Sequence, residues 1–201
     1  MPRLSLLSVL FWFLLPACIF VATAPDETRP QTAQAVHDKT RVEYDHYKNS
    51  TWVNGPTINA SSLTAFHLRS LWIGGSQKSL QLYVSDKSSS WRHFAHANDS
   101  DGNSLPLTPI GTDVDSFSYG RIHNTWCYED VAVELTKEYL ESHASSGMSV
   151  KVWGNAGERI VDVPPFYIEG FLRCLGDGTT TPVPRMPIEN TPDLAEAEEA
   201  L

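Results

Sequence analysis

Alternating apolar and polar residues run through the middle of the chain and predict β-strands. Leu80, Leu82 and Val84 fall on one face of an extended segment, while Gln81 and Tyr83 fall on the other. This period of two is typical of a strand with one buried face. The same alternation recurs at residues 131–135, and the segments AFHLRSLW and WRHFAHA are further strand candidates. Several half-buried strands are therefore expected.

A hairpin and two helices complete the predicted elements. The segments MSVKVWG and ERIVDVP are joined by GNAG, Gly154 to Gly157, which suits a tight turn because glycine and asparagine accept positive φ. One helix is expected to begin at Thr136, a good N-cap, and to stop before Gly147. The other, PPFYIEGFLRCL, opens on proline and ends before Gly176.

These elements predict a mainly β fold, α+β by content. We expect an antiparallel, sandwich-like domain of residues 42–175 with two short helices. Residues 25–41 are polar and rich in Gln, Thr and Ala, which predicts a tether. Residues 176–201 are rich in proline and threonine and end in acidic residues, which predicts a disordered tail.

Residues 1–24 predict an export signal. Arg3 is the last charged residue before Asp26, and the run between them is apolar. A basic start followed by an apolar segment directs a chain to the translocon. Three outcomes stay open for this segment. It is cut before Cys18, it is cut after Ala24, where ATA offers small residues, or it is retained as a membrane anchor.

Residues 15–18, LPAC, resemble the lipobox of bacterial lipoproteins, in which a small residue precedes the cysteine that receives the lipid. The resemblance implies cleavage before Cys18, attachment of lipid (palmitate among the acyl chains) and anchoring in a membrane. With Ile19 at the next position, it also implies an outer-membrane lipoprotein that faces the periplasm or the cell surface. A secreted or an inner-membrane-anchored protein is the alternative.

Three cysteines leave one unpaired in an oxidising compartment. Acylation or cleavage takes Cys18 out of the count and leaves Cys127 and Cys174. We therefore expect a disulfide between Cys127 and Cys174 that clips the last helix to the sheet. In the chain-entropy model such a bond contributes about 4 kcal/mol to stability.

Charge and motifs narrow the function. The formal net charge of −9 argues against a nucleic-acid partner, because such proteins need a basic face. The chain has neither CxxC nor HExxH, and His93 and His96 fall on opposite faces of a strand, so no metal site and no cofactor are expected. No serine has the sequence context of an activated nucleophile. We expect a non-enzymatic protein.

Tryptophans provide the candidate binding surface. Trp153 falls on the polar face of its strand, in register with Lys151, and Trp52 lies in an aromatic-rich stretch with Tyr44 and Tyr47. Exposed tryptophans stack on sugar rings or anchor partner proteins, and the alternative is that they fill the core.

The sequence leaves three classes of function. The first is an exported, membrane-anchored envelope protein whose β domain is structural or binds an envelope protein or a glycan. The second is a secreted binding protein of a eukaryote or virus, glycosylated at the sequons that begin at Asn49, Asn59 and Asn98. The third is a small exported hydrolase whose site has no recognised motif.

Overall fold

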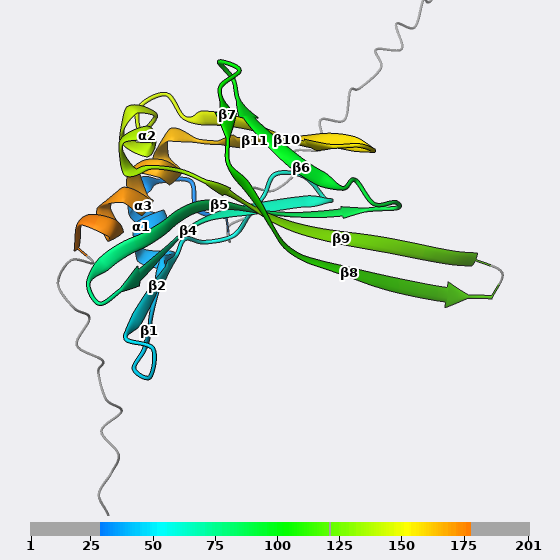
Figure 1. Ribbon diagram of the computed structural model, residues 1–201, viewed down its shortest axis with the longest axis horizontal. Helices are drawn as coiled ribbons and strands as arrows, with labels where there is room; N and C mark the ends of the chain where they lie inside the picture. Colours follow the sequence, from blue (N-terminus) through cyan, green and yellow to red (C-terminus); the bar gives the residue numbers. More distant parts are fainter. Residues whose placement is uncertain (1–28, 121, 178–201) are drawn as a thin grey trace, which may run out of the picture.

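The computed structural model describes residues 29–120 and 122–177, and within these ranges the fold is mainly β, with antiparallel sheets and three helices (Figure 1). The predicted fold class is confirmed. The elements in chain order are α1 (Ala33–Lys39), β1 (Arg41–Asp45), β2 (Ser50–Asn54), β3 (Ile58–Asn59), β4 (Thr64–Ile73), β5 (Ser76–Ser88), β6 (Phe94–Asp99), β7 (Ser104–Leu105), β8 (Leu107–Tyr119), β9 (Ile122–Glu134), α2 (Lys137–Ser142), β10 (Met148–Gly154), β11 (Gly157–Val163) and α3 (Pro165–Asp177).

Two sheets form from these strands. The larger has the order β1-β2-β4-β5-β9-β8, with β3 added beside β4, and the smaller has the order β11-β10-β6-β7. The hairpin expected around GNAG is β10–β11, in which Gly154 is opposite Gly157. The helix expected at Thr136 is α2, and the hydroxyl of Thr136 accepts a hydrogen bond from the backbone amide of Tyr139 at 3.1 Å.

The core lies between the sheets and against the helices. Leu68 of β4 and Leu82 of β5 are fully buried and opposite each other. Val150 of β10 and Val161 of β11 belong to the same apolar cluster. Because neighbouring side chains of a strand point to opposite faces, each of these strands gives only every second residue to the core.

Helix α3 packs closely against α1 because residue 170 is glycine. A Cβ on Gly170 would collide with the carbonyl oxygen of Ala33 and with the Cβ of Val36, which is completely buried. Thr32 caps α1, since its hydroxyl accepts a hydrogen bond from the amide of Ala35 at 3.1 Å. Helix α1 falls inside residues 25–41, where the sequence predicted a polar tether. The sequence did not predict this helix because Val36 is its only buried residue, and one apolar position does not give a recognisable helical period.

Tyr167 joins α3 to the large sheet. Its hydroxyl donates a hydrogen bond to the carbonyl oxygen of Pro56 at 2.7 Å and accepts one from the amide of Leu68 at 3.3 Å. Burial raises the pKa of Tyr167, which keeps the phenol protonated. A Cβ at Gly55 would lie 2.6 Å from this hydroxyl oxygen, so glycine at position 55 leaves room for the contact.

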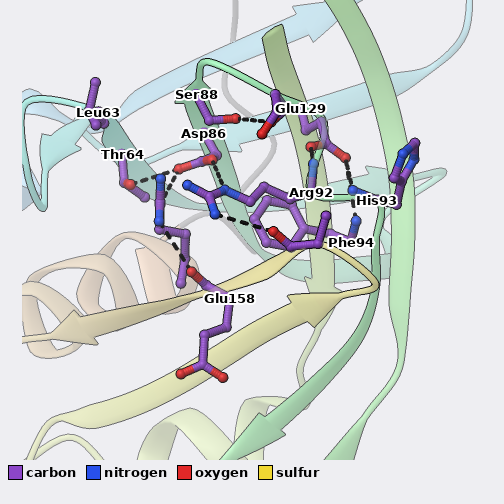
Figure 2. A network of polar contacts seen from close by, with 12 residues as sticks. Leu63, Thr64, Asp86, Ser88, Arg92, His93, Phe94, Glu129 and Glu158 are labelled. Carbon is purple, nitrogen blue, oxygen red and sulfur yellow. Dashed lines mark hydrogen bonds and ion pairs between the residues drawn. The ribbon is translucent and has the colours of Figure 1, made fainter.

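A buried polar network joins the two sheets (Figure 2). Asp86 of β5 accepts hydrogen bonds from Thr64 Oγ1 at 2.9 Å and from Arg159 Nε of β11 at 2.5 Å. Glu129 of β9 accepts hydrogen bonds from three successive backbone amides at residues 92–94. The carboxylate of Asp86 therefore holds the small sheet to the large one, and the carboxylate of Glu129 fixes the start of β6.

Cys127 and Cys174 are not joined by a disulfide, so that prediction is wrong. Cys127 lies on β9 opposite Ser88. Cys174 lies on α3, and its thiol contacts the carbonyl oxygen of His37 in α1 at 3.5 Å. Helix α1 leads into β1, which three strands separate from β9, whereas a disulfide needs Cα atoms within about 7 Å. An even number of cysteines does not show which of them lie close enough to form a disulfide.

The export segment, Cys18 and the tail from residue 178 lie outside the described residues. Within residues 29–120 and 122–177, no helix is long and apolar enough to cross a membrane.

Candidate functional site

One face of the large sheet packs on the core, and the other, which we call the open face, is half-exposed. Along β4, Phe66 and Leu68 point to the core, so His67 and Arg69 lie on the open face. The strand register places Tyr83 of β5 directly opposite His67. Side chains from several strands therefore meet on this face.

Arg69 stacks against two aromatic rings of the open face. Its guanidinium carbon lies 5.3 Å from the ring centre of Trp52 and 4.5 Å from that of Tyr83. His67 stacks on Tyr83, with ring centres 4.8 Å apart and an angle of 30° between the planes. A cation–π contact of this kind contributes about 0.5–2 kcal/mol, depending on exposure. We call Trp52, His67, Arg69 and Tyr83 the aromatic ladder.

The imidazole of His67 is neutral at neutral pH. Burial lowers the pKa of His67 to about 4, and the positive charge of Arg69 acts in the same direction. Among the described residues, neither ring nitrogen of His67 has a hydrogen-bond partner. One nitrogen of the neutral ring can donate a hydrogen bond to a ligand, and the other can accept one.

Asp130 of β9 adds an acidic group to the open face. Burial, and after it the hydrogen bond to Asp130, raises the pKa of Tyr83 to about 12. The Oδ1 atom of Asp130 is buried and, within the described part of the chain, has no hydrogen-bond partner. A buried polar atom without a hydrogen-bond partner lowers the free energy of unfolding by about 1–3 kcal/mol.

An open cavity of about 780 Å³ adjoins the aromatic ladder at the β1 end of the open face. We call it the edge cavity. His67 belongs to both the ladder and the cavity. The other polar side chains of its lining come from the end of α1, from β1, and from β2 with the loop that follows: Asp38, Lys39, Thr40, Arg41, Glu43, Asn54 and Thr57. Strand pairing explains the grouping, because Arg41 is opposite Asn54 and Glu43 is opposite Trp52.

The lining of the edge cavity mixes charges with neutral hydrogen-bonding groups. Lys39 and Arg41 supply cations, Asp38 and Glu43 supply carboxylates, and Asn54 supplies an amide that both donates and accepts. The volume lies within the range of small-molecule sites, which is about 300–1,000 Å³. The cavity therefore suits a polar ligand that has many hydrogen-bonding groups and little net charge.

The structure does not bring together the two tryptophans that the sequence indicated. Trp52 is half-buried in the aromatic ladder of the large sheet. Trp153 is 37% exposed on β10 of the small sheet, as its alternation predicted. Its ring stacks on His96 with centres 4.2 Å apart, and its indole N–H donates to Asn98 Oδ1 at 2.8 Å.

Sequence reasoning missed most of the site. The alternation in AFHLRSLW contains the signal that His67 and Arg69 share the face opposite Phe66 and Leu68. The alternation does not show the strand order β1-β2-β4-β5. That order places Trp52 of β2 and Tyr83 of β5 on either side of His67 and Arg69 of β4. In residues 29–120 and 122–177, no group of three or more His, Cys, Asp or Glu side chains is arranged to hold a metal ion.

The chain matches no protein-family model, no curated protein and no solved structure.

Proposed function

We propose that this chain is an exported, membrane-anchored protein of the cell envelope whose β domain binds a glycan without altering it. The N-terminal sequence supports the location, through its apolar run and the lipobox-like LPAC at residues 15–18. The observation that supports the binding role is the edge cavity beside the aromatic ladder.

A saccharide matches the chemistry of this site. Its hydroxyl groups both donate and accept hydrogen bonds, as do the neutral imidazole of His67 and the amide of Asn54. Arg41 and Glu43 offer a charge-assisted donor and acceptor. The apolar face of a sugar ring packs on aromatic surface, which Trp52 supplies on the same face of the sheet.

Binding fits the cavity better than catalysis. An efficient general base has a pKa near the working pH, whereas burial holds the pKa of His67 at about 4. The imidazole is therefore a weak proton acceptor at neutral pH but a competent hydrogen-bonding group.

A panel of envelope oligosaccharides, titrated into the folded protein by calorimetry, tests the binding role. Asn54→Ala and Glu43→Ala should each weaken binding of the selected oligosaccharide at least about tenfold, since each removes a hydrogen bond worth about 1.4 kcal/mol or more. Trp153→Phe, on the small sheet, is the matched control and should bind as the wild type does. If no oligosaccharide binds, or if the control weakens binding equally, the proposal fails.

Labelling with radioactive palmitate tests the anchor. We expect label in the wild type and none in Cys18→Ala, which should persist as a larger precursor or appear in the soluble fraction. If Cys18→Ala migrates and fractionates like the wild type, the anchor does not depend on this thiol. The retained apolar segment would then be the better account.

A secreted glycoprotein is the second candidate, because two of the three sequon asparagines, Asn49 and Asn59, are exposed. Asn98 is engaged by Trp153 and by the carbonyl oxygen of Gly102. Glycosidase treatment of the natively produced protein decides the point. A mobility shift that disappears in an Asn49→Gln, Asn59→Gln variant favours this candidate, and an unchanged mobility excludes it.

A further inference from the structure

Strand β8 forms one edge of the large sheet and extends well beyond the body of the domain. It pairs with β9 on one side only, and the β8–β9 hairpin projects as a two-stranded arm (Figure 1). All residues from 110 to 118 are exposed. An edge strand presents unpaired backbone N–H and C=O groups, so it can template the addition of another strand.

The exposed arm combines acidic and apolar side chains. Asp113 and Asp115 lie on the same face two residues apart, and among the described residues neither takes part in an ion pair. Their cross-strand neighbours are Tyr128 and Trp126, which are uncharged. Val114, on the other face of the arm, is 49% exposed. The acidic face also carries Phe117, which is 58% exposed, and the other face offers Val114 among hydroxyl side chains.

Lys87 of β5 forms no ion pair with either of the two carboxylates. Lys87 Nζ lies 4.7 Å from the ring centre of Trp126 and 5.4 Å from that of Tyr128. Its ammonium group is thus held over the aromatic rings of β9 and forms no ion pair within 4 Å in the described part of the chain. Within residues 29–120 and 122–177, no cation forms an ion pair with Asp113 or Asp115, so both carboxylates can meet an outside cation.

The other sheet edges lack this combination. Strand β1 has only five residues, Arg41–Asp45, and carries both signs of charge. Strand β11 also carries both signs, and two of its three charged side chains are paired within the domain: Glu158 with Lys151 at 3.1 Å, and Arg159 with buried Asp86. Strand β7 has two residues. Only β8, among these edges, is long, acidic and clear of the body.

We propose that the β8 edge, residues 112–118, is a docking site for an extended segment of a partner protein that carries Lys or Arg at every second position. The added strand pairs with the β8 backbone and sets its basic side chains beside Asp113 and Asp115. Its alternate apolar side chains lie beside Val114. A second copy of this chain is a poorer occupant, because pairing two β8 edges about Val114 or Asp115 sets carboxylate against carboxylate.

A short synthetic peptide in which lysine alternates with valine is the probe, and fluorescence anisotropy with the whole folded chain is the readout. The wild type should bind it, whereas the Asp113→Lys, Asp115→Lys double variant should lose at least about tenfold in affinity. The same variant should gain affinity for a matched peptide in which glutamate replaces lysine. Glu138→Lys with Asp162→Lys changes the net charge equally, away from the arm, and should bind the lysine peptide like the wild type.

Backbone pairing is tested separately from charge. A lysine–valine peptide N-methylated at alternate residues cannot form strand hydrogen bonds along one edge and should not bind. The proposal is overturned if the methylated peptide binds equally, if the control double variant loses as much affinity, or if the wild type forms a dimer through β8 that excludes the peptide. None of these outcomes depends on glycan binding at the edge cavity.

Discussion

Arg159 of β11 donates a hydrogen bond from Nε to Asp86 of β5 at 2.5 Å, and this ion pair joins the two sheets. The Asp86 side chain is completely buried, and that of Arg159 is 21% exposed. Arg92 Nε lies 3.9 Å from the second carboxylate oxygen. The position of the small sheet on the large one therefore depends on one buried carboxylate between two cations.

Replacing Asp86 with alanine should lower the free energy of unfolding by about 3–5 kcal/mol, because it leaves the partly buried guanidinium groups of Arg159 and Arg92 without their counter-charge. Urea unfolding followed by circular dichroism measures the change. Glu158→Gln is the control, since the Glu158–Lys151 pair lies on the surface of the same hairpin and contributes at most about 1 kcal/mol. Equal losses in the two variants would show that the buried pair does not hold the sheets together.

His67 should make stability depend on pH. Its pKa is about 4 in the folded protein and 6.5 in the unfolded chain. Between these values the unfolded state binds a proton that the folded state does not, so the free energy of unfolding falls as the pH decreases from 6.5 to about 4. The loss is about 3 kcal/mol. It should be absent in His67→Gln, and an imidazole that titrates near its ordinary pKa in an NMR experiment would contradict the account.

Reduction should leave the thermal midpoint unchanged, because the described fold has no bond between Cys127 and Cys174. Peptide mapping under non-reducing conditions should likewise find no cross-link between them. A cross-link, or a drop in the midpoint of several degrees on reduction, would mean that the helix α3 sits closer to β9 than the structure places it.

The local elements of this fold are largely readable from the sequence. Leu80, Leu82 and Val84 alternate as predicted and lie in the core, and Thr136 caps α2 as predicted. These outcomes depend on side-chain period and on hydrogen bonds between near neighbours, which a sequence displays directly.

The site depends on pairings that the sequence does not display. Arg69 reaches Trp52 and Tyr83 only because β2 and β5 flank β4. The sequence indicated both Trp52 and Trp153 as candidate binding residues, yet Trp52 lies on the large sheet and Trp153 on the small one. Alternation assigns a residue to a face of its own strand, whereas the order of strands follows from packing of the whole domain.

Glycan binding at the edge cavity is tested most directly by an NMR titration of the folded protein with the selected oligosaccharide, observed at the tryptophan indole and histidine imidazole resonances. The two sheets offer matched reporters, with Trp52 and His67 on the open face and Trp153 and His96 stacked on the small sheet. Saturable shifts at Trp52 and His67, with Trp153 and His96 unchanged, are the predicted result. Shifts at Trp153 and His96 alone would contradict the assignment of the glycan site to the edge cavity.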